Sequence, residues 1–133
     1  MTVNFKEKAQ MIHDELIEIR RWFHMHPELS FEEVETGKKI AEILRKHGIE
    51  VKENVGKTGL IGILEGGKPG KVVGLRADID ALPITEINEV SYKSKVDGKM
   101  HACGHDSHMT SLIGAAIILS AAALREAYMI IKL

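Results

Sequence analysis

The chain has 133 residues, of which 44% are apolar and 28% are charged, as in a soluble globular protein with one hydrophobic core. Its formal net charge is −1 with acidic and basic residues interspersed, which argues against nucleic acid or an acidic membrane surface as a partner. A single cysteine cannot form an internal disulfide and the first residues lack an apolar signal segment, so we expect a cytoplasmic protein.

Two helices are predicted in the first part of the chain. Apolar residues recur with helical spacing over about residues 5–23, and Pro27 would end that helix. Ser30 and Glu33 have the spacing of a capping box, which predicts that a second helix follows directly. Gly48 is suited to the left-handed conformation at the end of that helix.

Three short strands are predicted in the middle of the chain, over residues 49–53, 60–64 and 72–77. Residues 66–70 have the composition of a turn, so we expect the second and third strands to form a hairpin. Residues 72–75 are continuously apolar except for one glycine, which predicts burial on both faces of a sheet.

Residues 78–100 have no convincing periodicity and predict a long functional loop. A helix is expected to begin near Asp106 or Ser107, either of which can cap it, and to continue to about Ala127. Its apolar stretch is too short to span a bilayer. Residues 128–133 are typical of a strand or a frayed tail, and the order of elements predicts an α/β fold with helices packed on a sheet.

Residues with metal-ligating side chains crowd together just before this last predicted helix. Thiolate and imidazole ligands suit Zn, Co, Ni or Mn. Cys103 and His105 would project to the same side of an extended segment, and Gly104 would let the backbone bend toward the ion. We therefore predict a transition-metal site; the alternative is an inert buried cysteine among ordinary histidines. The crowded residues are His101, Cys103, His105, Asp106 and His108.

Two aspartates follow the third predicted strand. Asp78 and Asp80 alternate along the chain and are expected to share one face, at the strand end where α/β proteins usually bind ligands. An aspartate there can accept the free N–H of a ligating histidine and fix its tautomer. In the alternative interpretation, one aspartate pairs with Arg76 and the other caps the loop.

His24 and His26 have the spacing of a weak His-x-His pair. We favour a structural interpretation for both, because the segment has the pattern of an amphipathic helix end followed by a proline turn. No phosphate-binding glycine loop and no serine nucleophile elbow is recognisable in the sequence.

Three segments together resemble the N-terminal part of the M20 metallopeptidase family, in particular the branch of aminoacylases, hippurate hydrolases and auxin-conjugate amidohydrolases. They are RWFHMHPELS at residues 21–30, RADIDALPI at residues 76–84 and KMHACGHD at residues 99–106, and the resemblance covers about residues 8–120. It implies that residues 1–133 form a truncated, zinc-peptidase-like part of the catalytic domain, with helices on a mixed sheet and without the lid or dimerisation domain.

The resemblance also implies an activity. Such enzymes hydrolyse the amide bond of N-acyl amino acids or similar small amides with two divalent metal ions, for which Zn, Mn, Co or Ni are candidates. Cys103 and His105 would be metal ligands, and Asp80 would support one of them. The other ligands and the general-base glutamate are expected further downstream, so we expect this chain to be weakly active or inactive alone. His101, Asp106, His108 or Asp78 could supply a makeshift third ligand.

Two other functions compete with this one. A non-catalytic metal-binding module could associate with a second copy through the exposed edge of an unfinished sheet. A thiol enzyme that uses Cys103 with a nearby histidine is less favoured, because such nucleophiles usually take their base from a distant part of the sequence.

Overall fold

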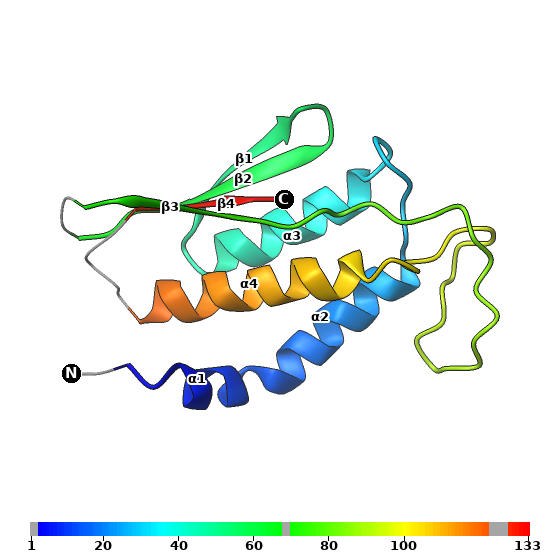
Figure 1. The fold of residues 1–133 in the computed structure, drawn as a ribbon, viewed down its shortest axis with the longest axis horizontal. Coiled ribbons are helices and arrows are strands. Elements are labelled where there is room, and N and C mark those ends of the chain that lie inside the picture. The colour runs from blue at the N-terminus through cyan, green and yellow to red at the C-terminus, as the bar shows by residue number, and fades with distance from the viewer. Residues whose placement is uncertain (1–2, 68–69, 123–127) are drawn as a thin grey trace.

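The computed structural model describes residues 3–67, 70–122 and 128–133, which form helices packed on a mixed sheet as predicted (Figure 1). The strand order is β1-β2-β4-β3; β3 and β4 are parallel, and the other neighbouring pairs are antiparallel. Within these ranges no helix is both long and apolar enough to cross a membrane. In chain order the elements are α1 (Phe5–Met11), α2 (His13–Met25), α3 (Val34–Lys46), β1 (Glu50–Val55), β2 (Gly59–Leu64), β3 (Val72–Arg76), α4 (His105–Ala121) and β4 (Tyr128–Lys132).

The first predicted helix is two helices in the structure. Ile12, with φ −102° and ψ 7°, separates α1 from α2. The side chain of Asn4 caps α1 by accepting the N–H of Glu7 at 3.2 Å. The end of α2 at Met25 agrees with the prediction, because the residue before Pro27 is disfavoured in a helical conformation.

A residue outside the predicted capping box accepts the free backbone N–H groups at the start of α3. Ser30 and Glu33 do not form that box: the side chain of Glu33 instead accepts the hydroxyl proton of Thr58 at 2.6 Å. The carboxylate of Glu28 accepts two backbone N–H groups of the first turn of α3, at 3.0 and 2.7 Å. The prediction was wrong about which side chain caps the helix, because a carboxylate from the preceding turn reaches the free N–H groups first.

The predicted hairpin between β2 and β3 is wrong, because β4 lies between these two strands. β2 forms its hairpin with β1 instead. Glycines lie opposite β4 on both sides, with Gly62 facing Ile131 and Gly74 facing Ile130. A Cβ on Gly62 would lie 3.2 Å from Cδ1 of Leu44 and 3.3 Å from Cγ2 of Ile49, so the absence of a side chain there helps these two residues to pack closely on β2.

The burial predicted for residues 72–75 is also wrong. β3 is the outermost strand of the described sheet, and the side chains of Val72 and Val73 are 57% and 46% exposed. An apolar run therefore marks a strand that could be covered on both faces, whereas its place in the strand order decides whether it is covered.

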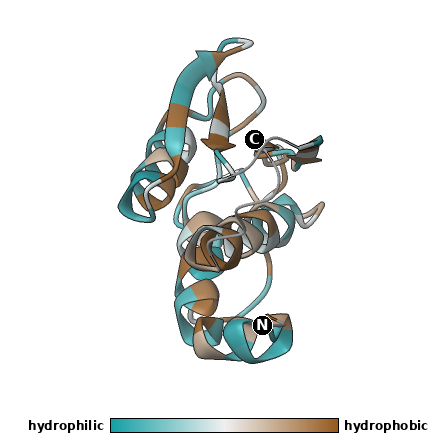
Figure 2. Cartoon of the chain, turned by 90° about the vertical axis from the view of Figure 1, so that its left-hand side faces the viewer, coloured by the Kyte–Doolittle hydropathy of each residue, from teal (hydrophilic) through white to brown (hydrophobic). Residues whose placement is uncertain are grey.

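The core lies between the sheet and the helices. α3 packs on β1 and β2, α4 packs on α3, and α2 packs on the far side of α4 (Figure 1). The N-terminal helix is mostly hydrophilic, whereas helical segments in the middle of the molecule are strongly apolar (Figure 2). α4 ends at Ala121; the predicted extension to Ala127 falls on residues 123–127, outside the described ranges. The largest fully buried apolar side chains are Phe23, Ile40, Leu44, Leu60, Met109, Ile113 and Ile131.

Candidate metal centre

The connection from β3 to α4 is a long irregular loop, as predicted, and it folds back on itself (Figure 1). Leu82 and Met100 exchange two backbone hydrogen bonds at 2.9 and 3.0 Å. This isolated bridge holds the two ends of the loop side by side. The segment that carries Asp80 therefore lies next to the segment that leads to Cys103.

Asp80 contacts His105, the first residue of α4. Nδ1 of His105 lies 3.0 Å from the Asp80 carboxylate and 2.9 Å from its backbone carbonyl oxygen. Both partners are acceptors, so in the neutral ring Nδ1 carries the proton and Nε2 has the free lone pair. This is the arrangement in which a carboxylate orients a metal-binding histidine.

Asp78 does not join Asp80. β3 ends at Arg76, and the guanidinium of Arg76 lies 2.6 Å from the Asp78 carboxylate in an exposed ion pair. The expectation that both aspartates serve one face is therefore wrong for Asp78, for which the alternative pairing with Arg76 holds.

Cys103 lies in a turn, and the extended segment predicted for Cys103 and His105 is not present. Its thiol is free and exposed. Gly104, at the N-cap of α4, has φ +86°, which a glycine adopts without strain and other residues rarely adopt. The helix thus begins one residue earlier than Asp106, and no side chain caps it at Gly104.

His101 is buried, and neither of its ring nitrogens has a hydrogen-bond partner among the described residues. Burial, aided by the charges of His24 and His105 and opposed by those of Asp106 and Asp80, lowers the pKa of His101 to about 4. The imidazole is therefore neutral at pH 7. His108 is exposed, with its ring centroid 6.0 Å from that of His105.

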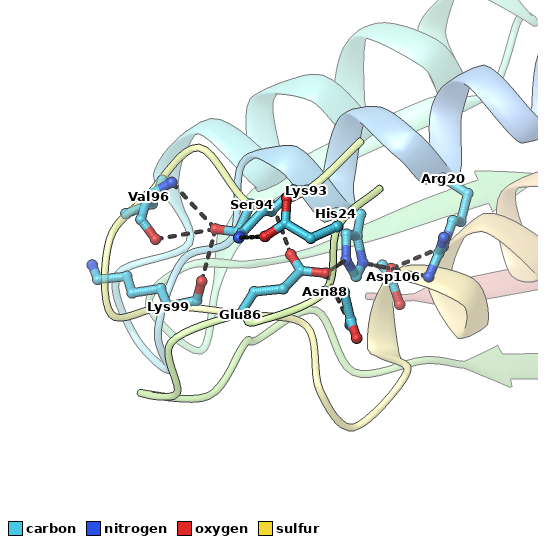
Figure 3. Close-up of polar contacts among 10 residues, drawn as sticks. Arg20, His24, Glu86, Asn88, Lys93, Ser94, Val96, Lys99 and Asp106 are labelled. Atoms are coloured by element: carbon cyan, nitrogen blue, oxygen red, sulfur yellow. Dashed lines mark hydrogen bonds and ion pairs between the residues drawn. The ribbon is translucent and has the colours of Figure 1, made fainter. Parts of the chain in front are cut away.

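The sequence pattern did not reveal a buried polar cluster next to this site (Figure 3). His24 of α2 lies between two carboxylates, with Nδ1 2.7 Å from Asp106 and Nε2 3.0 Å from Glu86. Arg20 makes an ion pair with Asp106 at 2.9 Å. The structural interpretation fits His26, whose Nδ1 donates to the carbonyl oxygen of Trp22 at 2.7 Å. Spacing could have drawn attention to His24, which shares a helix face with Arg20, four residues earlier.

The residues present fit part of a metal centre. His105 has an oriented ring with a free nitrogen, and Cys103 offers a thiol two residues away. Within the described ranges, no three or more histidine, cysteine, aspartate or glutamate side chains are placed to hold one ion together. A complete site usually needs at least three protein ligands, so further ligands would have to join these two.

Comparisons with known proteins relate this chain to metallopeptidases. The family model described as peptidase family M20/M25/M40 matches residues 74–128. Thermostable carboxypeptidase 2 of Saccharolobus solfataricus is 54% identical over 115 residues, which cover 86% of this chain and 29% of that protein. Hippurate hydrolase of Campylobacter jejuni is 50% identical over 106 residues, covering 80% of this chain and 28% of that protein.

A solved structure gives the same result. The crystal structure of the Bacillus subtilis YxeP protein, described as a dinuclear metal-binding peptidase of the M20 family, has a TM-score of 0.86 and 46% sequence identity. The match covers 92% of this chain and 35% of that protein. The predicted resemblance to the M20 metallopeptidase family is therefore confirmed. Within the family it matches the N-terminal part of the branch that contains hippurate hydrolase, N-acetylcysteine deacetylase and the IAA-amino acid hydrolases, and it spans less than a third of these relatives' length.

Proposed function

We propose that this chain provides part of the metal centre of an amidohydrolase that cleaves N-acyl amino acids or similar small amides. The observation that carries the proposal is the pair of hydrogen bonds to Asp80 from His105, two residues after the free thiol of Cys103. The names of the relatives N-acetylcysteine deacetylase, hippurate hydrolase and IAA-amino acid hydrolase support this substrate class.

The roles of the residues follow from their positions. Cys103 and His105 would hold a divalent Zn, Mn, Co or Ni ion, and Asp80 would fix the tautomer and direction of the His105 ring. Such an ion, when bound, polarises the scissile carbonyl and acidifies water. Within the described ranges, no three or more side chains of ligand type are placed to hold one ion, so we expect weak or no hydrolysis by this chain alone. The exposed free thiol is compatible with a cytoplasmic location, which stays a prediction.

Metal uptake tests the proposal. The purified chain, dialysed against Zn²⁺, is expected to retain the ion, and Cys103→Ser or His105→Ala to lower its affinity at least about tenfold, because each removes a ligand. Asp80→Asn is expected to weaken binding about 10–100-fold by removing the charge that orients His105. Elemental analysis and competition with a chelating dye measure both effects.

His13→Ala is the control, since His13 is an exposed histidine at the start of α2, outside the predicted ligand cluster. It should bind Zn²⁺ like the unaltered chain. The metal assignment fails if the unaltered chain retains no zinc, or if Cys103→Ser retains as much as the unaltered chain does.

The exposed edge of β3 favours a second candidate function, self-association. Val72 and Val73 lie exposed on the outermost strand of the described sheet, where unpaired backbone groups can pair with another chain. If this edge joins two copies, Val73→Lys should shift the chain from dimer to monomer in small-angle scattering at high concentration. A monomer before the substitution would rule this function out.

A further inference from the structure

The buried side chain of His24 connects the two segments that carry the candidate metal centre (Figure 3). Nδ1 lies 2.7 Å from the carboxylate of Asp106, in the first turn of α4. On the other side of the ring, Nε2 lies 3.0 Å from the carboxylate of Glu86, in the long loop. The imidazole of α2 thus joins a loop residue and a helix residue that lie 62 and 82 positions away from it in the sequence.

On the loop side, Glu86 organises the residues that lead to Cys103. Its carboxylate accepts the backbone N–H of Ser94 at 2.6 Å, and the hydroxyl of Ser94 lies 2.7 Å from the carbonyl oxygen of Lys99. Met100 then forms the bridge with Leu82. The position of Glu86 therefore sets the path of the chain up to the turn that presents Cys103.

The loop makes two further contacts with α2 near His24. The ring of Tyr92 meets the His24 ring edge-on, with centroids 5.6 Å apart, and the guanidinium of Arg20 lies 5.2 Å from the Tyr92 centroid. The backbone N–H of Lys95 donates to the carbonyl oxygen of Met25 at 2.9 Å. The loop is thus docked on the last turns of α2, with His24 at the centre of the contact.

On the helix side, Asp106 directly follows His105. It is fully buried, and its second carboxylate oxygen accepts the N–H of Ser107 at 2.9 Å. The bond from His24 therefore fixes the rotation of the first turn of α4, and with it the direction in which the His105 ring leaves the helix.

Histidine is suited to this place because its two ring nitrogens, each of which can carry a proton, point in opposite directions, one toward each carboxylate. Arg20 adds an ion pair with Asp106. A glutamine of similar length has one amide donor end and one acceptor end, so it could satisfy one carboxylate and would turn its oxygen toward the other.

We propose that His24 is a positioning residue of the candidate metal centre, which holds the loop that leads to Cys103 and the helix turn that carries His105 in a fixed relation. Its effect on the metal rests on the proposed function, whereas its effect on the loop does not. The two shortest hydrogen bonds of His24 go to Asp106 and Glu86, neither of which belongs to the candidate ligand pair, Cys103 and His105.

The test compares the unaltered chain with His24→Gln, with the double variant His24→Gln/Glu86→Gln and with Leu44→Ala. Leu44→Ala removes a buried side chain of α3 that lies outside the cluster, so it controls for general loss of stability. Co²⁺ affinity is measured from the thiolate-to-cobalt absorption band, and hydrogen exchange is measured on the metal-free chain. Circular dichroism establishes that each variant folds, and Ile40→Val replaces Leu44→Ala if the latter does not.

His24→Gln is expected to weaken Co²⁺ binding about 10–100-fold, the range typical of residues that orient a metal ligand. The same substitution should also speed hydrogen exchange in the metal-free chain, selectively in residues 84–104 and in the first turn of α4. The double variant should recover part of both effects, because the two amides can pair with each other and one buried charge is gone. Leu44→Ala should leave the cobalt affinity unchanged.

Equal cobalt affinity in His24→Gln and the unaltered chain would overturn the proposal, as would faster exchange spread evenly over the whole chain. If the unaltered chain shows no cobalt–thiolate band, the proposed function fails instead. The exchange pattern then decides about His24 alone: selective acceleration in the loop supports its positioning role, and an unchanged pattern refutes it.

Discussion

Replacing Asp106 with alanine is expected to lower the free energy of unfolding by about 3–5 kcal/mol, the usual cost of removing one partner from a buried ion pair. Asp106 is fully buried and contacts two positively charged or protonatable groups, Arg20 and His24. Without it, His24 loses its shortest hydrogen bond, and Arg20 loses its ion pair. Urea denaturation at pH 7, followed by circular dichroism, measures the effect.

Asp78→Ala is the control for this substitution. Asp78 also makes a short ion pair, at 2.6 Å with Arg76, but the pair is exposed. Its loss is expected to cost at most about 1 kcal/mol, because solvent screens such pairs and their side chains are free to move. Similar losses in the two variants would show that the buried cluster contributes no more than a surface pair.

The second large effect concerns acid stability through Glu86. Burial would raise the pKa of this carboxyl, but the hydrogen bonds from His24, from the backbone N–H of Ser94 and from Asn88 outweigh it and hold the pKa below its ordinary value of 4.5. A lowered pKa in the folded state stabilises the protein above the unfolded-state pKa, and this contribution is lost as the pH falls through the folded-state value.

Glu86→Gln should therefore destabilise the chain by about 1.5–3 kcal/mol at pH 7, the range for hydrogen bonds to a charged group. The difference from the unaltered chain should shrink as the pH falls from about 5 toward 3, since Glu86 takes up a proton in the unfolded state before it does so in the folded state. Unfolding curves at several pH values measure this difference. A difference that is constant down to pH 3, or that grows, would contradict the assigned direction of the pKa shift.

Local signals in the sequence were enough for the helices and the loop. The helical spacing up to Phe23, the proline at position 27 and the aperiodic residues 78–100 all act within a few residues of where they occur. The structure agrees with each of them apart from the break at Ile12 and the identity of the capping residue at α3.

The strand order could not be predicted in the same way. A turn composition indicates that the chain reverses, but it does not say which distant strand fills the space beside β2. β4 occupies that place, where Ile131 is fully buried. The exposure of Val73 follows from the same order, because β3 is left at the edge of the described sheet.

In the candidate site, too, the features with a local sequence signal could be predicted, and the contacts between distant segments could not. The aspartate pattern drew attention to Asp80, and the structure places it on His105. The link between His24 and Asp106 spans 82 residues and has no local sequence signal beyond the helical spacing from Arg20. A histidine that pairs with carboxylates from two distant segments looks, in the sequence, like any histidine at a helix end.

X-ray absorption at the zinc edge of the Zn²⁺-loaded chain tests the central claim most directly. The account predicts one sulfur scatterer at about 2.3 Å together with nitrogen or oxygen scatterers at about 2.0–2.2 Å, and loss of the sulfur in Cys103→Ser. A spectrum of the unaltered chain that contains only nitrogen and oxygen scatterers would contradict the assignment of Cys103 as a metal ligand.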